Sequence, residues 1–228
     1  MIVLLTKKFD NEQFEQAQQR GIILEYVPFI NTKQHFIDEV AIKWFSEHTF
    51  EIWIFTSAVA ASYASKLIGT NRVKSPEAIY AVGEKTGATL QNLGIPIVYP
   101  AHSNAESLAD IIIEKHRRAR CCYFKGNISL QTIESKLGSA GMLLTAYECY
   151  TTEICKPTIN PDRYDSVVFF SPSAVEAYLQ SKLAYENKKL FAIGKTTASA
   201  VRQLMGQNAV VPEEKGFDAL IKCIEANK

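Results

Sequence analysis

Tyr80-Ala-Val-Gly-Glu-Lys-Thr-Gly-Ala-Thr-Leu90 is the stretch that decides the fold, because a close copy follows as Phe191-Ala-Ile-Gly-Lys-Thr-Thr-Ala-Ser-Ala-Val201. The matched glycines, Gly83 and Gly194, lie 111 residues apart. Short stacked repeats recur every ~20–50 residues, so this distance argues against a solenoid and for two similar domains of about 110 residues each. Two similar domains form a cleft, and clefts between domains are common ligand sites.

A second matched element lies upstream of each copy. Ile54-Phe-Thr-Ser57 corresponds to Phe169-Phe-Ser-Pro172 at an offset of 115 residues, with Tyr63 and Tyr178 in register behind them. The pattern around these pairs alternates short apolar strands with amphipathic helices, which is typical of parallel sheets covered by helices.

The composition is that of an ordinary globular protein. Of the 228 residues 47% are hydrophobic, and the formal net charge is +1. A charge so near zero gives no support for binding nucleic acid or an anionic membrane. No apolar run approaches the ~20 residues of a membrane span. In Met1–Lys8 the charges follow the apolar stretch, the reverse of a secretion signal, so we expect a cytoplasmic protein.

No motif in the sequence indicates a metal or a cofactor. The five cysteines lack CxxC spacing, and we interpret them as reduced thiols, with the adjacent Cys121 and Cys122 in a buried strand. The four histidines are scattered. Gly194-Lys195-Thr196 resembles the end of a P-loop, but Lys189 stands where that loop needs a glycine. A dinucleotide-binding GxGxxG pattern is absent as well.

We expect the following elements. The predicted strands are Ile2–Leu5, Ile22–Ile30, Ile52–Phe55, Ala78–Val82, Ile97–Val98, Cys121–Phe124, Met142–Ile154, Ser166–Phe170, Leu190–Ile193 and Ala209–Val211. The predicted helices are Asn11–Arg20, Phe36–Glu47, Ser57–Leu67, Lys85–Leu93, Ala105–Lys115, Leu130–Leu137, Ser173–Leu183, Thr196–Met205 and Phe217–Ala226.

The repeat does not begin at residue 1, which suggests a discontinuous first domain. We expect residues 1–28 and 154–228 to form domain one and residues 33–146 to form domain two. The long extended stretch Met142–Ile154 suits a connector. Linker strands near residues 25–32 and 147–153 would then run side by side, and such linkers allow domains to open.

The candidate binding residues follow the ends of the predicted strands. In each copy a glycine, Gly83 or Gly194, turns the chain into a helix whose free N–H groups face the carboxyl edge of the sheet. Such edges suit carboxylates or phosphates. Hydroxyl groups are added there by Thr56, Ser57, Thr86, Ser171, Ser173, Thr196 and Thr197. A Ser or Thr at a helix start is a cap more often than a ligand contact, so this interpretation competes with a purely structural one.

These residues together resemble the uroporphyrinogen-III synthase family. The matching stretches are Ile54-Phe-Thr-Ser57, Tyr80-Ala-Val-Gly-Glu-Lys-Thr86, Phe124-Lys-Gly-Asn127, Tyr147-Glu-Cys-Tyr-Thr151, Val168-Phe-Phe-Ser-Pro-Ser-Ala-Val175 and Ala192-Ile-Gly-Lys-Thr-Thr197. One departure is Ala58, where the family often has proline.

The resemblance implies a fold of two flavodoxin-like parallel-sheet α/β domains (the HemD-like arrangement) joined by a two-stranded β linker. It also implies a cofactor-free lyase of haem biosynthesis whose substrate is hydroxymethylbilane, a linear tetrapyrrole with eight carboxylates. Water is lost as the macrocycle closes with inversion of ring D.

The resemblance also implies roles for particular residues. Tyr150 is the candidate catalytic residue, with Tyr147 as its rival if the register slips. Gly126 and Asn127 join the candidate substrate contacts. Local cations could assist at Lys7, Lys125 or Lys195, although a solvated surface charge is the favoured interpretation of each lysine.

Two other classes of function compete with the enzyme. One is a non-catalytic two-domain protein that binds a small polyanion, and a secretion signal would favour it. The other is a duplicated protein-interaction module, which requires an exposed apolar patch. We expect a monomer.

Overall fold

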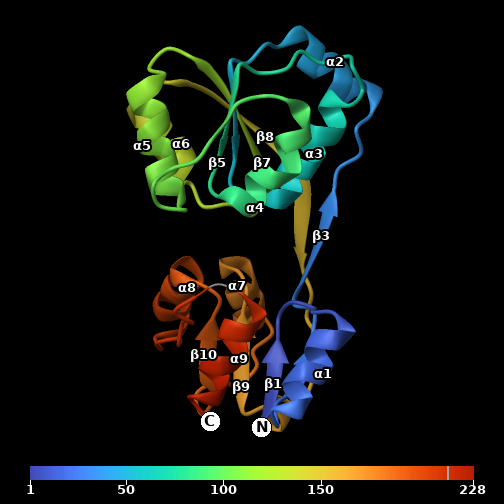
Figure 1. Cartoon of the computed structure of the whole chain (residues 1–228), viewed down its shortest axis with the longest axis vertical. Coiled ribbons are helices and arrows are strands. Elements are labelled where there is room, and N and C mark those ends of the chain that lie inside the picture. Colours follow the sequence, from blue (N-terminus) through green and yellow to red (C-terminus); the bar gives the residue numbers. More distant parts are fainter. Residues whose placement is uncertain (215) are drawn as a thin grey trace. The chain divides into compact units, whose positions relative to one another are not determined.

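Two separate sheets contain the ten strands found in the described residues, 1–214 and 216–228, of the computed structural model (Figure 1). The chain divides into two units. Unit 1 comprises Met1–Asn31 and Glu153–Lys228, and unit 2 comprises Thr32–Thr152. The chain passes between the units within β3 (Ile30–Gln34) and again within β8 (Leu143–Ile154).

Unit 1 contains a four-stranded parallel sheet in the order β10-β9-β1-β2. Its strands are β1 (Ile2–Leu5), β2 (Ile23–Tyr26), β9 (Ser166–Phe169) and β10 (Lys189–Ala192). Its helices are α1 (Asn11–Gln19), α7 (Pro172–Gln180), α8 (Lys195–Met205) and α9 (Phe217–Glu225), with a 3-10 turn at Pro161–Arg163. Val210 forms an isolated parallel bridge with Phe191. With that bridge as a fifth position, the order is the flavodoxin-like 2-1-3-4-5.

Unit 2 contains a six-stranded sheet in the order β3-β8-β7-β4-β5-β6. Its remaining strands are β4 (Ile52–Phe55), β5 (Ala78–Ala81), β6 (Ile97–Val98) and β7 (Arg120–Gly126). Its helices are α2 (Glu39–Glu47), α3 (Ala58–Ile68), α4 (Glu84–Gly87), α5 (Ala105–Lys115) and α6 (Thr132–Ser139), with a 3-10 segment at Ala88–Leu93.

The two sheets have the same internal arrangement but a different chain order. Across the sheet of unit 2, the neighbouring strands β8, β7, β4, β5 and β6 correspond in this order to β2, β1, β9, β10 and the Val210 bridge of unit 1. The pairs β4–β5 and β9–β10 are therefore equivalent, and these are the pairs that carry the sequence repeat. In unit 1 the strands equivalent to β7 and β8 come first along the chain. In unit 2 the chain forms β4, β5 and β6 first and adds β7 and β8 afterwards.

Helices cover both faces of each sheet, as the alternation of side chains along the central strands requires. Along β4, Trp53 and Phe55 pack on the α2 and α3 side, whereas Ile52 and Ile54 pack on the α5 and α6 side. In unit 1 one apolar cluster lies under α7 and α8 and a second lies under α1 and α9. Figure 1 shows α5 and α6 side by side over one face of the unit 2 sheet. Each sheet is thus a buried layer with only its strand ends available to a ligand.

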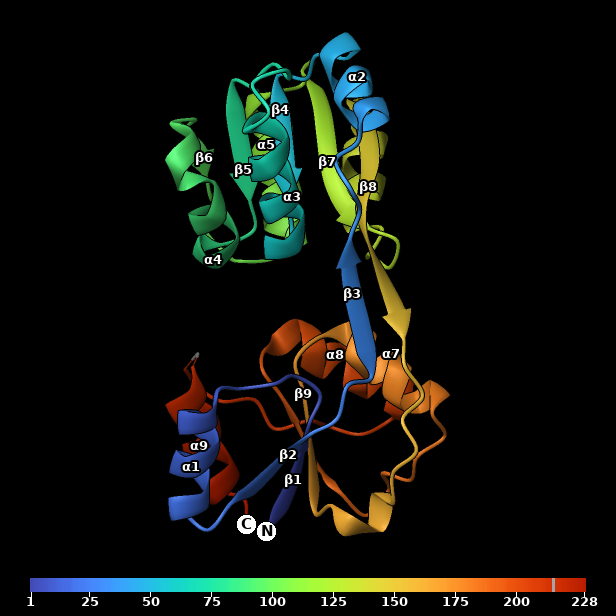
Figure 2. The ribbon, with the colours of Figure 1, turned by 90° about the vertical axis from the view of Figure 1, so that its right-hand side faces the viewer.

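Strands β3 and β8 lie side by side at the edge of the six-stranded sheet (Figure 2). The main-chain N–H of His35 donates to the carbonyl of Cys149, and the N–H of Cys155 donates to the carbonyl of Phe29. The extended stretch predicted over Met142–Ile154 is β8, which begins at Leu143.

Several sequence-based expectations need correction. The helix predicted over Phe36–Glu47 begins only at Glu39, because the Asp38 carboxylate caps the N–H of Ala41 at 2.8 Å. Phe36 is left before the helix and is 93% exposed, and Val40 is 75% exposed, so neither belongs to the apolar face.

The other corrections concern the two copies of the repeat. The helix predicted over Lys85–Leu93 is α4 followed by a 3-10 segment, and the strand predicted over Ala209–Val211 reduces to the single bridge at Val210. Strands β4 and β9 end at Phe55 and Phe169, so their offset is 114 residues and the predicted 115 is wrong.

Candidate functional site

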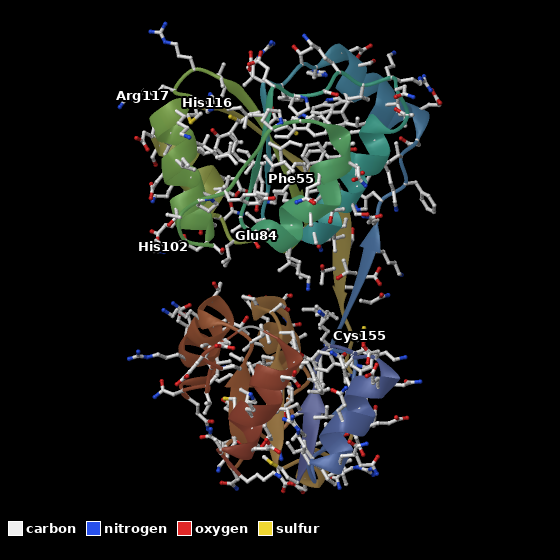
Figure 3. All side chains as sticks on the ribbon, in the orientation of Figure 1. Phe55, Glu84, His102, His116, Arg117 and Cys155 are labelled. Carbon is white, nitrogen blue, oxygen red and sulfur yellow. The ribbon has the colours of Figure 1, made fainter. Side chains whose placement is uncertain are left out.

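The candidate site of unit 2 lies at the carboxyl edge of its sheet, where β4, β7 and β8 run side by side. Phe55, at the end of β4, pairs with Phe124 of β7, and Gly126, at the end of β7, pairs with Tyr150 of β8. Because neighbouring strands in this part of the sheet are parallel, the residues that follow β4 and those that end β7 meet at one edge. Figure 3 labels Phe55 and Glu84, and it shows His116 and Arg117 toward the end of this unit that is opposite Glu84.

Thr56, which follows β4, is held by a buried tyrosine. Its hydroxyl lies 2.8 Å from the hydroxyl of Tyr123, which is 2% exposed. Burial raises the pKa of Tyr123 to about 12, and the hydrogen bond with Thr56 acts in the opposite direction. The hydrogen bond fixes Thr56 at the strand end, and burial keeps the Tyr123 phenol protonated at neutral pH.

Tyr150 lies against the main chain at the end of β7. Burial raises the pKa of Tyr150, while hydrogen bonds with the Ser57 side chain and the Gly126 main chain, and the charge of Lys125, lower it. Ser57 also caps α3, because its Oγ accepts from the N–H of Ala60 at 3.1 Å.

A β-bulge precedes Tyr150. Lys125 pairs with Glu148, whereas the next residue, Gly126, pairs with Tyr150, so Cys149 is an extra residue in β8. Bulges redirect side chains at the ends of strands. Tyr150 consequently packs against the same apolar cluster as Tyr147, three residues earlier.

Lys125 corrects a sequence-based interpretation. A solvated surface charge was the favoured interpretation, but the residue is 8% exposed and its Nζ lies 2.6 Å from Glu134 Oε1. The other carboxylate oxygen of Glu134 is buried and has no hydrogen-bond partner. A buried ion pair therefore lies beside Tyr150. Lys7 and Lys195, the other two lysines considered, are exposed.

Asn127 uses its side chain to hold β8. Its Oδ1 accepts from the N–H of Thr152 at 2.7 Å, and its Nδ2 donates to the carbonyl of Thr152 at 3.2 Å. Its main-chain N–H donates to the carbonyl of Tyr150 at 3.3 Å. Asn127 thus fixes the backbone on both sides of Thr151.

The two glycine turns of the repeat have the same backbone conformation. Gly83 has φ −176° and ψ 167°, and Gly194 has φ −173° and ψ 171°, each at the N-cap of a helix without a side-chain cap. Thr86 and Thr197 are 7% and 4% exposed, whereas Thr196 is exposed. Of the three threonines predicted to offer hydroxyl groups here, only Thr196 presents one at the surface.

The corresponding edge of unit 1 carries hydroxyl groups as well. Ser171 Oγ accepts from the N–H of Ala174 at 3.2 Å and lies 3.0 Å from Ser173 Oγ. Thr6 Oγ1, at the end of β1, donates to the carbonyl of Val168 at 3.1 Å and accepts from the N–H of Phe170 at 3.3 Å. Ser171 and Ser173 are partly exposed, while Thr6 is buried.

Tyr147, the rival of Tyr150, belongs to an aromatic cluster. Its hydroxyl lies 3.0 Å from that of Tyr63, and its ring contacts Trp44, Phe45 and Phe124. Burial raises the pKa values of both tyrosines. Regular alternation along a strand would place Tyr147 and Tyr150 on opposite faces, and the bulge that changes this has no signal in the sequence. Sequence reasoning also missed Tyr123 and Glu134, whose partners come from other elements.

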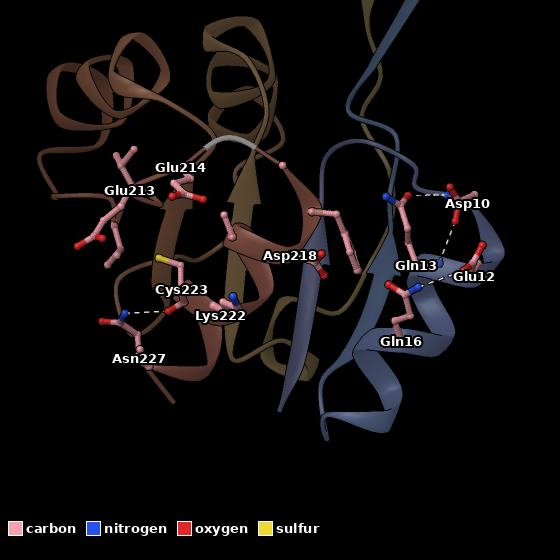
Figure 4. A pocket seen from close by; sticks show the side chains of 16 residues that line it. Asp10, Glu12, Gln13, Gln16, Glu213, Glu214, Asp218, Lys222, Cys223 and Asn227 are labelled. Atoms are coloured by element: carbon pink, nitrogen blue, oxygen red, sulfur yellow. Dashed lines mark hydrogen bonds between the residues drawn. The ribbon is translucent and has the colours of Figure 1, made fainter.

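A broad hollow of about 980 Å³ lies in unit 1 along α9 and the start of α1, and none of the candidate site residues lines it (Figure 4). Its described lining includes one lysine, Lys222, and five carboxylates: Asp10, Glu12, Glu213, Glu214 and Asp218. This excess of negative charge disfavours an anionic ligand. The hollow is therefore a poor site for a polycarboxylate.

Within residues 1–214 and 216–228, no cluster of three or more His, Cys, Asp or Glu side chains is arranged to hold a metal ion. None of the helices described in these ranges combines the length and apolar character needed to cross a bilayer.

A family model described as uroporphyrinogen-III synthase HemD matches residues 12–222. The chain belongs to the uroporphyrinogen-III synthase family. A uroporphyrinogen-III synthase of Chlorobaculum parvum is 28% identical over 148 residues, and that alignment spans 59% of this chain and 60% of the relative. The chain thus matches about three fifths of the length of this curated relative.

Solved structures carrying the family name share the fold. A mutant uroporphyrinogen III synthase of Thermus thermophilus superposes with a TM-score of 0.77 at 15% identity, covering 99% of this chain and 98% of that one. A synthetase of Helicobacter pylori gives a TM-score of 0.64 at 15% identity and covers 99% of each chain. The α/β fold implied by the resemblance is confirmed.

Proposed function

We propose that the protein is a uroporphyrinogen-III synthase that cyclises hydroxymethylbilane to uroporphyrinogen III, with inversion of ring D and loss of water. The observation that carries the proposal is the family match over residues 12–222. The placement of Tyr150 at the carboxyl edge of the unit 2 sheet, against Ser57 and Gly126, supports a role for this phenol.

The reaction starts with loss of the hydroxyl group from the hydroxymethyl carbon of the linear substrate. The electron-rich pyrrole supplies the electron pair that breaks the C–O bond, and the oxygen leaves as water after accepting a proton. The substituted α-carbon of ring D attacks the resulting methylene carbon to form a spirocyclic intermediate. The bond between ring D and its original bridging carbon then breaks, and the free α-carbon of ring D bonds to that bridging carbon, so that the macrocycle closes with ring D inverted. The pyrrole finally loses a proton, which balances the proton taken by the leaving oxygen.

Tyr150 is the proposed donor to the leaving hydroxyl. A hydrogen bond that lowers the pKa of a phenol is one that its oxygen accepts, because it stabilises the anion. Ser57 and the Gly126 N–H act in this sense on Tyr150, and so does the charge of Lys125. Burial keeps the phenol protonated at neutral pH, so that it has a proton to donate to the leaving hydroxyl.

A phenol with an ordinary pKa near 10 is a weak acid at pH 7, so its contribution is modest. Most of the rate enhancement then comes from holding one geometry for ring closure. Positioning alone supplies about 7–11 kcal/mol in favourable systems. A substrate with many rotatable bonds benefits from this more than from strong acid catalysis.

The eight carboxylates of the substrate require donors, and the net charge of +1 means that the protein carries little excess positive charge. We propose that main-chain N–H groups at the strand ends and helix starts of each unit bind them. Contributors of this kind are Thr56, Ser57 and Gly83 in unit 2, and Ser171, Ser173, Gly194 and Thr196 in unit 1. Thr86 and Thr197 are buried, and the Thr86 N–H donates to the carbonyl of Gly83 at 3.0 Å, so these two residues are proposed to shape the glycine turns rather than to contact the substrate through their hydroxyls.

The proposal is tested with hydroxymethylbilane generated enzymatically in the same vessel. The porphyrinogens are oxidised and their isomers are separated by chromatography. Formation of the type III isomer supports the proposal, whereas exclusive formation of the uninverted type I ring, the spontaneous product, contradicts it. A non-catalytic polyanion-binding protein would bind the substrate and leave the isomer ratio at the spontaneous value.

A further inference from the structure

Gly126 leaves space for the aromatic ring of Tyr150. A Cβ atom at this position would lie 2.5 Å from Cζ and 2.9 Å from Cδ2 of Tyr150, and closer still to Cε2. Carbon atoms in van der Waals contact are roughly 3.5–4.0 Å apart. The ring of Tyr150 therefore occupies the volume that any larger residue at position 126 would need.

The usual conformational reason for a glycine does not apply here. Gly126 is not among the glycines with positive φ, which are Gly21, Gly94, Gly141, Gly206 and Gly216. It is buried and lies in the ladder of β7 opposite Tyr150. An alanine could adopt this backbone conformation, so the contact with the ring is what requires a glycine.

The main chain of Tyr150 cannot shift easily to relieve such a contact. The bulge at Cys149 fixes the register, and the carbonyl of Tyr150 accepts from the N–H of Asn127 at 3.3 Å. Two residues later, the Asn127 side chain bonds both main-chain groups of Thr152. A methyl group at position 126 would consequently displace the ring rather than the strand.

From these contacts we infer that Gly126 is a positioning residue, which acts through Tyr150 and does not contact the substrate. Its missing side chain lets the Tyr150 ring lie against the end of β7, at the carboxyl edge of the sheet. The inference rests on the proposed function for its consequence in catalysis. The predicted substrate contact at Gly126 is thereby replaced by a contact with the catalytic side chain.

The test compares Gly126→Ala, Tyr150→Phe and the double variant with the wild type. We expect Tyr150→Phe to lower kcat by about tenfold or less, since a phenol is a weak acid at neutral pH. Gly126→Ala is expected to lower kcat by about the same factor with KM little changed. In the Tyr150→Phe background it is expected to have no further effect on kcat, because the hydroxyl that it displaces is already gone.

A second readout separates this role from a merely structural one. The phenyl ring left by Tyr150→Phe still meets the new methyl group, so Gly126→Ala should lower Tm in both backgrounds although it lowers kcat in only one. If Gly126→Ala multiplies the loss of kcat in the Tyr150→Phe background, or leaves kcat unchanged in the wild-type background, the inference is wrong.

A third variant covers the case in which Gly126→Ala does not fold. Gly126→Ala/Tyr150→Ala removes the ring along with the contact, and it is expected to have a higher Tm than Gly126→Ala alone. A double variant no more stable than Gly126→Ala would overturn the inference. Failure of the proposed function is recognised separately, because the wild type would then give no type III isomer.

Discussion

The buried ion pair beside Tyr150 makes a prediction that can be worked out from its geometry. Lys125 Nζ lies 2.6 Å from Glu134 Oε1, and the two side chains are 9% and 20% exposed. Glu134→Gln keeps the shape and one acceptor oxygen but removes the charge that compensates the ammonium group. Breaking a buried pair from one side costs about 3–5 kcal/mol. Because the amide oxygen still accepts a hydrogen bond, we expect the lower end of that range, about 3 kcal/mol.

The protein carries its own control on the same helix. Lys136 of α6 bonds Asp110 at 2.7 Å, but these side chains are 32% and 62% exposed. Exposed pairs contribute about 0–1 kcal/mol, so Asp110→Asn should change the free energy of unfolding by no more than that. Lys125→Met/Glu134→Leu should be close to the wild type, since apolar replacement of a whole buried pair is often neutral or stabilising. Glu134 Oε2 is buried without a hydrogen-bond partner, so the double variant also removes an unpaired buried oxygen, which favours its stability.

The assay is urea unfolding followed by tryptophan fluorescence. Both tryptophans, Trp44 and Trp53, lie in unit 2, so the signal reports the unit that contains the ion pair. Equal free-energy changes for Glu134→Gln and Asp110→Asn would refute the reasoning, and so would a double variant as unstable as Glu134→Gln.

The remaining predictions concern catalysis, pH and two glycines. Tyr150→Phe should lower kcat by about tenfold or less, and a loss beyond about a thousandfold in a folded protein would contradict the positioning account. Burial raises the pKa values of Cys121, Cys149 and Tyr123 to about 12 in the folded protein. Their ordinary values are about 8.5 for Cys and 10 for Tyr, so the stability they contribute is complete below about pH 8.5 and is lost as the pH rises toward about 12. Urea unfolding at a series of pH values checks this, and a stability that rises over the same range would show the sign to be wrong. Gly138→Ala should stabilise α6 by about 0.5–1 kcal/mol, since no atom lies within 4 Å of the new methyl group. Gly87→Ala should lower Tm, because a Cβ there would lie 2.6 Å from Cε1 and 2.7 Å from Cζ of Tyr99. Equal Tm changes for Gly138→Ala and Gly87→Ala would contradict both the open space at Gly138 and the close contact at Gly87.

Features encoded by short stretches could be predicted from the sequence. The glycine turns at Gly83 and Gly194 share one backbone conformation because each depends on a strand end and the helix start after it. The helix predicted over Ala105–Lys115 is α5 with the same bounds, because Asn104 Oδ1 caps its start by accepting from the N–H of Ser107 at 2.8 Å. The strands β1, β4 and β6 have the predicted bounds because their apolar runs end sharply.

Features that depend on distant contacts could not be predicted. Lys125 is buried because Glu134 of α6 comes to lie beside it, and no local pattern encodes that approach. The helix predicted over Phe36–Glu47 is longer than α2, because the carboxylate of Asp38 starts α2 after Phe36. The one-residue error in the repeat offset arose from matching aromatic residues, whereas the capping serines Ser57 and Ser171 give the correct alignment.

The most direct test of the central claim is the isomer composition of the product at increasing amounts of protein. We expect the type III fraction to rise with protein concentration until it dominates. The Tyr150→Phe variant should reach the same fraction only at higher protein concentrations. A type III fraction that stays at the background of the uncatalysed reaction at every protein concentration would contradict the account.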